Sequence, residues 1–363
     1  MAKDKIYQQV AAFLRKNIAS GTLKVGDAIY SENLLCEKLG VSRTSVRRAI
    51  RMMVDENILV SHQGKGTFVR SNGKGIIHGT LGMLNLYTRV LQYDITDSYY
   101  SDIIYGAEAA TRERELDFSL FSKEFHTESE ARKLFSKLKY DGVIVDGAFQ
   151  MDSGKYNFLS DIFPNLVYVD GNPEECSQPV AAPDAEKGFT GLLELAVKRS
   201  GPIFFVGQES TSIFRWKKEC FFRAAEKAGV DFTYIDYSKN IKNDIFDQLF
   251  HVHGDYNPLI YEAVKRIAVP GNVGGTIIAT CDYTAVKTRS SLIRLGYSIP
   301  RDFAVCGFGG IGFSSYTVPA LTTVKVDSSA LSRIAVDMLL AKIENREIPS
   351  GLLDVGVIKR DSL

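Results

Sequence analysis

Apolar and polar positions in the first part of the chain follow the period of short helices. An amphipathic helix is predicted where apolar side chains recur three or four positions apart: Ile6, Val10, Phe13, Leu14 and Ile18. A second helix carries apolar positions at Leu34, Leu35 and Leu39, and it stops at Gly40, where the chain can turn. Ser42 is a favourable N-cap for a third helix.

The third helix is predicted to bury one face and to keep a basic face polar. Val46, Ile50 and Met53 form the apolar face. The polar positions are arginines: Arg43, Arg47, Arg48 and Arg51. Two apolar runs, 58–60 and 67–69, then flank a Gly-containing turn and predict a β-hairpin. This order of elements predicts a winged helix-turn-helix, whose second motif helix fits a DNA major groove.

Residues 1–70 resemble the winged-helix DNA-binding domain of the GntR type. The resemblance rests on three collinear segments: 31–35, 40–49 and 63–69. It implies DNA contacts from the helix-turn-helix and the wing, assigned to Ser31, Asn33, Ser42, Arg43, Thr44, Ser45, Arg47, Arg48, His62, Gln63, Gly64, Lys65 and Gly66. Arg43 and Arg47 share one helix face, so we expect them to reach bases or phosphates. The alternative is a solvated basic helix face on some other domain.

The charge distribution agrees with a DNA-binding head. Residues 1–75 contain thirteen Lys and Arg against six Asp and Glu, a net charge of +7. The whole chain carries +1, so residues 76–363 carry −6. Lys and Arg side chains on such a basic head can displace counterions from DNA phosphates. Residues 71–79, which contain three glycines, are the predicted linker.

Beyond the linker, strand-like and helix-like segments alternate. The predicted strands are 81–86, 118–121, 142–145, 166–169, 203–206, 232–234, 275–279 and 304–308. The predicted helices are 100–114, 128–138, 186–199, 214–228, 257–268, 283–295 and 327–344. Such alternation predicts parallel sheets with helices on both faces, and ligands bind these sheets at the carboxyl ends of strands. The fold class is therefore α/β with an N-terminal winged helix-turn-helix.

Residues 80–363 resemble the effector-binding and dimerisation domain of the LacI/GalR repressors, a relative of periplasmic sugar-binding proteins. The resemblance is carried by the segments 106–110, 139–145, 169–170, 204–207, 295–308, 319–324 and 358–362. It implies two doubly wound α/β subdomains, joined by three crossing strands, with a ligand cleft between them. A GntR-type head on a LacI-type body is similar to the arabinose repressors of Gram-positive bacteria. LacI relatives carry a hinge helix before the body, and the Gly-rich linker is a poor helix former.

The resemblance also places effector contacts at strand ends and helix starts. The positions that it assigns are Asn85, Tyr87, Tyr99, Tyr100, Asp146, Arg215, Lys217, Cys281, Asp282 and Gly309. A sugar presents apolar C–H faces and hydroxyls, so an aromatic side chain beside converging polar groups is the expected chemistry. Interface packing is the alternative role of the tyrosines, and a turn before Gly147 is that of Asp146.

Three of these positions depart from the pattern of the resembled repressors. Lys217 stands where they have an effector-binding arginine, and Arg215 is a substitute two residues earlier; surface charge is the alternative role of both. Cys281 replaces an asparagine before Asp282, for which helix capping is the alternative role. Gly309 replaces an acid that binds a sugar hydroxyl. The cleft therefore uses an unusual set of contacts or takes a different ligand.

The sequence gives little support to an enzymatic function. Residues 307–312 spell G-x-G-x-x-G after a strand, as in NAD-type oxidoreductases, but Pro319 follows too soon for the helix that this fingerprint should open. No catalytic Ser/His/Asp or Cys/His signature is recognisable. His251 and His253 lack a surrounding ligand pattern, so we expect no metal site and no cofactor. The five scattered cysteines predict structural thiols in a reducing compartment.

The resulting hypothesis is a ligand-responsive transcription regulator, a repressor of carbohydrate genes and not an enzyme. We expect a homodimer that binds an inverted-repeat operator and takes a small-molecule effector, most plausibly a sugar. A non-sugar effector is the alternative. The chain has no run of 18 apolar residues, so no membrane span is expected. Its first residues lack an apolar signal region, which favours the cytoplasm and argues against an exported sugar-binding protein.

Overall fold

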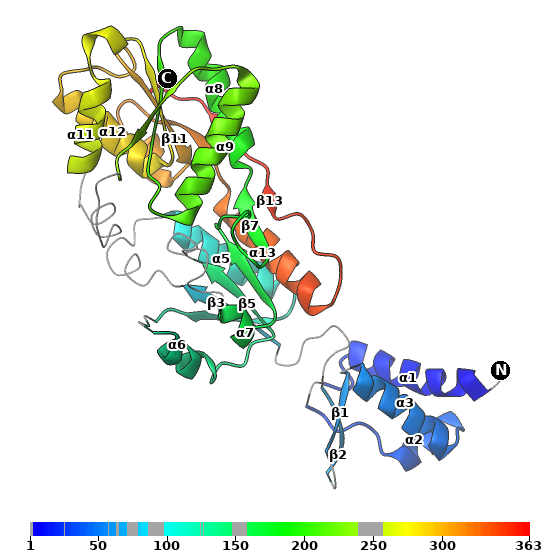
Figure 1. Cartoon of the computed structure of the whole chain (residues 1–363). Helices are drawn as coiled ribbons and strands as arrows, with labels where there is room; N and C mark the ends of the chain where they lie inside the picture. Colours follow the sequence, from blue (N-terminus) through cyan, green and yellow to red (C-terminus); the bar gives the residue numbers. More distant parts are fainter. Residues whose placement is uncertain are drawn as a thin grey trace.

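The structure is a computed structural model that describes residues 3–24, 26–56, 58–62, 65–70, 79–85, 98–123, 125, 127–146, 158–238 and 257–363. Figure 1 shows a small N-terminal domain, drawn in blue, and two α/β subdomains formed by the rest of the chain. The N-terminal domain contains α1 (Lys3–Ala19), α2 (Glu32–Leu39), α3 (Arg43–Asp55), β1 (Leu59–His62) and β2 (Gly66–Val69). This is the predicted winged helix-turn-helix.

Local signals fix the ends of the two motif helices. The Ser31 hydroxyl accepts a hydrogen bond from the Leu34 amide at the start of α2, and Gly40 ends this helix in the left-handed region with φ 63°. The Ser42 hydroxyl caps α3 by accepting from the Ser45 amide. Leu35 and Val46 then pack in one buried cluster with α1 and the hairpin. The helix boundaries are therefore set by side-chain capping, and burial sets the packing.

The body contains two six-stranded sheets, which define an N-subdomain and a C-subdomain. The N-subdomain sheet has the order β13-β7-β6-β5-β3-β4. Its strands are β3 (Thr80–Asn85), β4 (Asp117–Phe121), β5 (Gly142–Asp146), β6 (Leu166–Val169), β7 (Val180–Pro183) and β13 (Leu352–Leu353). The C-subdomain sheet has the order β14-β12-β11-β10-β8-β9. Its strands are β8 (Ile203–Gly207), β9 (Thr233–Asp236), β10 (Thr276–Ala279), β11 (Ala304–Gly309), β12 (Thr322–Lys325) and β14 (Gly356–Ile358).

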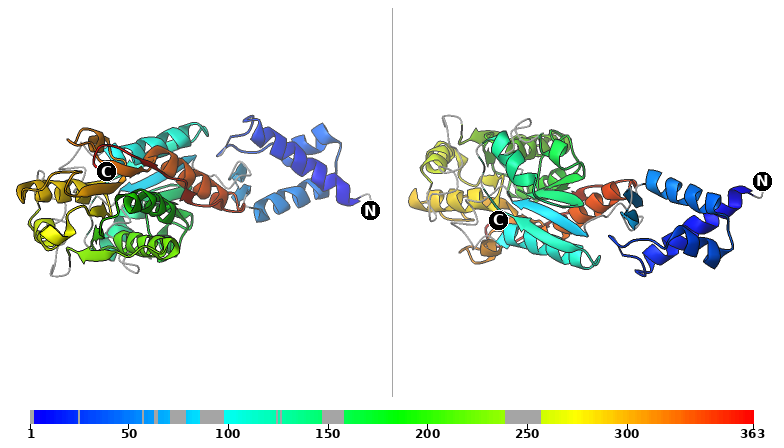
Figure 2. Two further views of the ribbon diagram at one scale, coloured as in Figure 1. Left: turned by 90° about the horizontal axis from the view of Figure 1, so that it is seen from above. Right: turned by 90° about the horizontal axis from the view of Figure 1, so that it is seen from below.

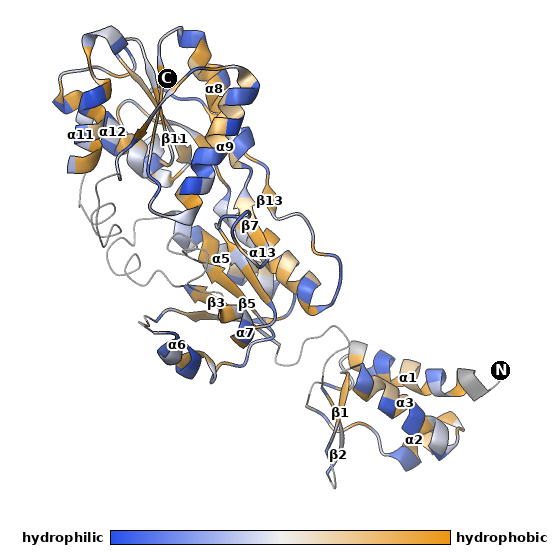
Figure 3. Ribbon diagram, viewed as in Figure 1, coloured by the Kyte–Doolittle hydropathy of each residue, from blue (hydrophilic) through white to orange (hydrophobic). Residues whose placement is uncertain are grey.

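All strand pairs in these two sheets are parallel except that between β12 and β14. The N-subdomain helices are α5 (Ser98–Arg112), α6 (Glu128–Phe135), α7 (Leu159–Ile162) and α13 (Ser328–Ile343). The C-subdomain helices are α8 (Ala185–Ala196), α9 (Ser212–Ala228), α11 (Pro258–Ile267) and α12 (Asp282–Arg294). Figure 2 shows helices on both sides of the strands, and the strands are strongly hydrophobic in Figure 3. This is the arrangement expected for parallel sheets.

The chain passes between the subdomains three times. It leaves the N-subdomain from β7 into α8, returns from β12 into α13, and leaves again from β13 into β14. One buried hydrophobic cluster extends through both subdomains. In the C-subdomain this cluster includes the Phe205 and Phe221 rings, which are stacked 3.9 Å apart, and the Phe189 and Phe308 rings, whose centroids are 4.9 Å apart. The expected three crossings and two subdomains are thus present.

The eight strands and seven helices predicted for the body are all found, with shifted ends. The strands that the sequence pattern missed are short: β7, β12, β13 and β14. In β12 the reason is chemical, because Thr322 and Thr323 read as polar but are fully buried. Their hydroxyls are satisfied by the Arg360 carbonyl and the Asp282 carboxylate. A hydrogen-bonded threonine can therefore occupy a buried strand position that a polarity pattern assigns to solvent.

Helices α5 and α13 approach closely because α5 has a glycine at their contact. A Cβ added at Gly106 would lie 2.7 Å from the Ser329 Cα and 2.8 Å from its carbonyl oxygen. These atoms belong to the backbone of α13, so they can move only if the helix moves. The Ser332 hydroxyl donates to the Ile103 carbonyl at 2.7 Å beside this contact.

We predict that Gly106→Ala destabilises the body. Alanine favours a helix over glycine by about 1 kcal/mol, but overpacking against a backbone typically costs about 1–3 kcal/mol. The net effect should be a lower melting temperature, measured by calorimetry. Gly271→Ala is the control, because a Cβ there meets nothing within 4 Å. A Gly106→Ala variant as stable as the wild type would show that α5 and α13 can separate at little cost.

Candidate functional site

The start of α3 presents two arginines to solvent. The side chains of Arg43 and Arg47 are 60% and 67% exposed. The Nε of Arg47 donates to both carboxylate oxygens of Glu32 on α2, at 3.0 and 3.1 Å. The Arg43 Nε lies 4.0 Å from the same carboxylate, and its guanidinium also donates to the Asn33 amide oxygen. Glu32 and Asn33 thus hold both arginines on one exposed surface.

These contacts leave the arginines available to another partner. An exposed ion pair contributes about 0–1 kcal/mol because water and salt screen it. A DNA phosphate or base edge can therefore replace the Glu32 contact at low cost, while the carboxylate still restricts where the guanidinium groups lie. Sequence reasoning did not include Glu32 among the site residues. Its position in the first turn of α2, beside the expected Ser31 and Asn33, was the available signal.

The other expected DNA-binding residues have mixed environments. Thr44, His62, Lys65 and Gly66 are exposed. Ser31 and Ser42 are N-caps, and the Ser42 and Ser45 hydroxyls also hydrogen-bond to each other at 3.0 Å. The Arg48 guanidinium lies 4.2 Å from the centre of the Tyr7 ring on α1, which turns it toward the domain. Gln63 and Gly64 lie outside the described residues.

The second candidate site lies where the carboxyl ends of the two sheets face each other. Asp170 follows β6 in the N-subdomain, and Lys217 comes from α9 in the C-subdomain. Both are buried, and Lys217 is 7% exposed. Burial raises the pKa of Asp170, whereas the charge of Lys217 and a hydrogen bond from Tyr99 act to lower it. The same lysine lies close enough to Cys281 to lower the pKa of its thiol, against the raising effect of burial.

Expected residues from both subdomains therefore meet in this cleft. Tyr99 and Lys217 lie near Asp170, and Cys281 lies near Lys217. Asp170 follows a predicted strand but is not among the expected effector positions. The Lys217 ammonium lies 4.9 Å from the centre of the Phe308 ring, so aromatic and charged groups are neighbours. The Tyr99 and Tyr100 rings make an edge-to-face contact 5.4 Å apart.

Several buried polar atoms in this region have no hydrogen-bond partner among the described residues. They are Asp170 Oδ1, Gln208 Nε2, Ser210 Oγ, Thr211 Oγ1 and Thr280 Oγ1. Their residues come directly after β6, β8 and β10, and β8 and β10 are parallel neighbours. An unsatisfied buried polar atom costs about 1–3 kcal/mol, so five of them near one cleft indicate a polar ligand site. The first polar positions after each apolar strand were the sequence signal for these residues.

Arg215 and Lys217 occupy different places. Arg215 donates to the Glu209 carbonyl at 3.1 Å and to the Glu175 carboxylate at 3.4 Å, so it lies on the rim of the cleft. Lys217 is buried, near enough to Asp170 for its charge to act on the pKa of that carboxyl group. The structure thus separates the two cations that the sequence could not distinguish, and it gives the interior position to the lysine.

Asp282 is turned into the protein. Its carboxylate accepts from the Thr323 hydroxyl at 2.5 Å and from the Ile311 amide at 2.9 Å. The expectation that it caps α12 is wrong, because Cys281 is the N-cap residue and makes no side-chain cap bond. A Cβ at Gly307 would lie 2.2 Å from the Asp282 Oδ1, so the glycine leaves room for this carboxylate. Gly309 has φ 136°, which disfavours an acidic side chain there.

Two further expected positions lie at adjacent strand ends. Asn85 ends β3 and is buried, and its backbone pairs with that of Asp146 at the end of β5. The Asp146 side chain and Tyr87 lie outside the described residues. The two strand ends are therefore neighbours, as parallel pairing requires.

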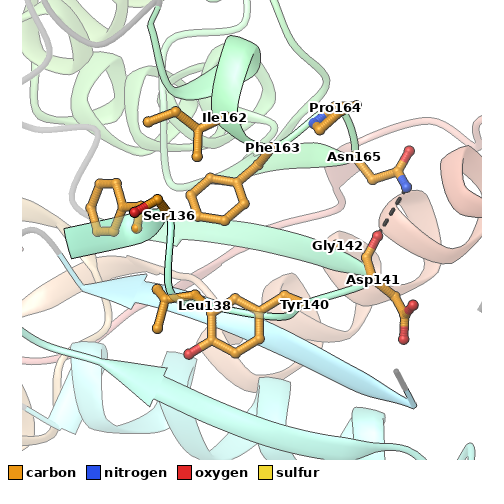
Figure 4. A pocket seen from close by; sticks show the side chains of 10 residues that line it. Ser136, Leu138, Tyr140, Asp141, Gly142, Ile162, Phe163, Pro164 and Asn165 are labelled. Carbon is orange, nitrogen blue, oxygen red and sulfur yellow. Dashed lines mark hydrogen bonds between the residues drawn. The ribbon is translucent and has the colours of Figure 1, made fainter. Parts of the chain in front are cut away.

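A separate pocket of about 170 Å³ lies at the amino-terminal edge of β5 and β6, opposite the cleft. Figure 4 shows the Tyr140 and Phe163 rings across this pocket, with Leu138, Ser136 and Ile162 around them. The Asn165 amide donates to the Asp141 carbonyl at 2.9 Å at its border. None of the expected effector positions lines it.

Other kinds of site were also considered. In the ranges that the structure describes, no group of three or more His, Cys, Asp or Glu side chains could hold a metal ion. None of the described helices is long and apolar enough to cross a membrane. The G-x-G-x-x-G segment runs into a four-residue 3-10 helix, Gly312–Ser315, and does not open an α-helix as a dinucleotide fingerprint would.

Two segments of the chain match models of known families. Residues 6–69 match the family described as bacterial regulatory proteins, gntR family, and residues 192–363 match the periplasmic binding protein-like domain. The chain joins a GntR-type DNA-binding domain to a periplasmic-binding-protein-like domain. Both resemblances inferred from the sequence are therefore confirmed.

Named relatives are transcription regulators, several of them named for sugar systems. Over 70 residues the chain is 46% identical to the mannosyl-D-glycerate transport/metabolism system repressor MngR of Escherichia coli (strain K12), covering 19% of this chain and 29% of that one. It is 30% identical to the regulator MalR of Clostridium butyricum over 40% of this chain and 45% of MalR. The match thus spans less than half of either relative. The arabinose metabolism transcriptional repressor of Geobacillus stearothermophilus is 23% identical and covers 94% of this chain and 92% of its own length.

Solved structures show the same fold. A transcriptional regulator CelR–cellobiose complex superposes with a TM-score of 0.61 at 17% identity, covering 89% of this chain and 91% of that chain. A lac repressor dimer bound to operator and the anti-inducer ONPF superposes with a TM-score of 0.60 at 15% identity, covering 78% and 93%. The body of this GntR-type chain therefore has the fold of LacI-family repressors.

We predict that Asp282 makes stability depend on pH between about 4 and 6. Burial raises the pKa of Asp282 from 3.8 to about 6, despite the opposing bonds from Thr323, Ile311 and Gly310. The folded state then binds a proton more readily than the unfolded state, so stability from this group falls as pH rises through that window. Above pH 6 the ionised carboxylate costs about 3 kcal/mol.

Urea unfolding of wild type and Asp282→Asn at pH 4 to 8 measures this effect. The stability of the variant relative to wild type should rise with pH up to about 6 and then stay constant. Asp302→Asn is the control, because Arg301 lowers the pKa of Asp302, so its contribution is lost only below about pH 4 and its difference from wild type should stay constant from pH 4 to 8. A difference between Asp282→Asn and wild type that does not vary with pH would contradict the shift.

Proposed function

We propose that this chain is a ligand-responsive DNA-binding transcription regulator, a repressor of carbohydrate genes that binds a sugar or sugar derivative in the cleft. The observation that carries the proposal is the cluster of buried, unpaired polar atoms at the cleft, in the same chain as an exposed pair of recognition-helix arginines. The names of the relatives, which include arabinose and sucrose repressors, support the ligand class.

The polar atoms of the cleft fit a polyhydroxyl ligand. Asp170 Oδ1 can accept a hydrogen bond, Gln208 Nε2 can donate one, and the hydroxyls of Ser210, Thr211 and Thr280 can do either. A sugar hydroxyl both donates and accepts, so one ligand can satisfy all of these atoms. The nearby Tyr99 and Tyr100 rings can cover an apolar C–H face. CelR, a structural relative, is named for a complex with cellobiose, which supports this chemistry.

A homodimer would set the spacing of two heads on an inverted-repeat operator. Apolar side chains on the body surface support this part of the proposal. Tyr316 and Val318 are 86% and 81% exposed in the loop before β12, and Tyr105 is exposed on α5. Apolar side chains that lie together on a surface can mark a place that a partner covers. The lac repressor in the related structure is a dimer bound to operator.

The effector would act by favouring one arrangement of the two subdomains. A ligand shifts this equilibrium only if it binds the two arrangements with different affinity. Such a regulator needs no catalytic step and no cofactor, and it acts where the chromosome is, in the cytoplasm. A non-sugar effector is the second candidate, because Lys217 and Gly309 depart from the contacts of the resembled repressors.

On this proposal, Arg43→Ala should weaken operator binding by about 1–3 kcal/mol if the guanidinium reads a guanine. Gel-shift titration at fixed salt measures the change. Arg15→Ala is the matched control, because Arg15 is also a partly exposed, ion-paired arginine of the N-terminal domain, but it lies on α1 and pairs with Glu56 at the far end of α3 from Arg43. Operator affinity of Arg43→Ala within twofold of the wild type would remove this residue from the DNA surface.

Thermal unfolding against a panel of neutral sugars, sugar acids and sugar phosphates should identify the effector class. A ligand at 100 times its dissociation constant stabilises the folded protein by about 2.7 kcal/mol. Lys217→Met should raise the dissociation constant of that ligand at least tenfold, because a hydrogen bond to a charged group contributes about 1.5–3 kcal/mol. Lys227→Met on the exposed side of α9 should have no effect. Equal affinity in the Lys217→Met variant would place the ligand elsewhere.

A further inference from the structure

The connection between β6 and β7 reaches across the cleft to α9. In this segment, residues 170–179, the Glu175 carboxylate accepts a hydrogen bond from the Ser212 hydroxyl at 2.6 Å. The Arg215 Nη2 donates to the same carboxylate oxygen at 3.4 Å. Ser212 and Arg215 belong to the first turn of α9, in the C-subdomain, whereas β6 and β7 belong to the N-subdomain sheet. One carboxylate therefore joins the two subdomains at the cleft rim.

A second side chain of the same segment strengthens this link. The Asn172 amide donates to the Ser212 carbonyl at 3.4 Å, and its oxygen accepts from the Glu174 amide at 2.9 Å. The backbone amides of Glu175 and Cys176 donate to the Asn172 carbonyl, which closes the turn. Asn172 and Ser212 are both buried. The turn is thus shaped by its own hydrogen bonds so that Glu175 faces α9.

The contacts differ in strength. The side chains of Arg215 and Glu175 are each about one-third exposed, so solvent screening leaves their ion pair only a small contribution to stability. The Ser212 hydroxyl is buried, and its short bond to a charged acceptor belongs to the stronger class of hydrogen bonds. Opening the cleft moves α9 away from residues 172–175 and breaks this bond. The more exposed Glu174 also contacts α9, through Arg223 at 3.1 Å. The Glu175–Ser212 contact is therefore the short, buried member of the contacts that resist opening on this side.

The same loop also carries unpaired cleft atoms. The hydroxyls of Ser210 and Thr211 have no described partner, and they directly precede Ser212. A ligand that hydrogen-bonds these hydroxyls acts on the segment that Glu175 holds. The link across the rim and the ligand contacts therefore share one short piece of chain.

We propose that Asn172, Glu175, Ser212 and Arg215 form a latch that holds the two subdomains together, and that Glu175 sets how readily they separate. The latch is a property of the body itself and requires no ligand or DNA. Its regulatory consequence, that an effector at Ser210 and Thr211 strengthens or releases the latch, rests on the function proposed above.

Hydrogen–deuterium exchange of the full chain tests the latch directly. Glu175→Ala removes both contacts to α9, so the amides of 170–176 and 208–216 should exchange about tenfold faster than in the wild type. Glu175→Gln keeps an oxygen that can accept from Ser212, so its effect should be smaller. Glu226→Gln is the matched control: Glu226 is an exposed glutamate on the same helix, away from the rim, and its exchange should equal that of the wild type.

Two outcomes would overturn the latch. If the amides of 170–176 and 208–216 in Glu175→Ala exchange within twofold of the wild-type rate, the Glu175 contacts do not hold the two subdomains together. If exchange in β3 and β4 becomes faster by the same factor as in 170–176 and 208–216, the variant has lost global stability and has not opened locally. The ligand panel is a separate arm: if it finds no effector while Glu175→Ala opens both segments, the latch stands and the effector function fails.

Discussion

Burial of both faces of each parallel sheet constrains where this protein can place polar chemistry. Strands such as β6, β8 and β10 are buried along their whole length, because helices cover the sheet on either side. A polar side chain within such a strand loses water and needs a hydrogen-bond partner inside the protein, as Thr322 and Thr323 have in β12. Polar side chains without a partner in the sheet are therefore placed just beyond the strand ends. Asp170, Gln208 and Thr280 follow β6, β8 and β10 in this way. The polar cleft therefore lies where the helix-covered strands end.

The two candidate sites use similar charged groups in opposite environments. Arg43 and Arg47 pair with Glu32 at the surface, where screening makes the pairs easy to exchange for DNA. Asp170 and Lys217 are both buried near the cleft, where burial raises the pKa of Asp170 and the charge of Lys217 opposes that rise. A DNA contact has to form and dissociate, so weak and exposed pairs suit it. A ligand site gains affinity when its groups are held in place before binding, which burial provides.

The subdomains are coupled by connections of two kinds. Three covalent crossings fix the directions in which the subdomains can move, and a continuous hydrophobic cluster passes between them. The hydrogen bonds around Glu175 are weaker and local, so they can break without unfolding either sheet. Strong packing preserves the fold of each subdomain, while a few polar contacts at the rim decide the relative position of the two subdomains. This division suits a body that must change arrangement and keep its fold.

The sequence by itself determined the domain types, the order of most elements and the exposed basic face of the recognition helix. Ser42 as an N-cap and Gly40 as a helix end are local features, because each depends on residues within one helical turn. The periodic burial of Val46 and Met53 is also local. For this reason the N-terminal domain was predicted almost completely.

The tertiary structure alone decided how the cleft is assembled. Lys217 and Arg215 are two residues apart, and no pattern distinguishes the one that faces Asp170 from the one that reaches Glu175. Asp282 reads as a helix cap, yet the space left by Gly307 draws its carboxylate to Thr323 and away from the helix end. These roles depend on contacts between segments far apart in the sequence, 40 residues for Arg215 and Glu175 and 41 for Asp282 and Thr323. Their proximity is fixed only when the sheets have formed and the chain has crossed between them.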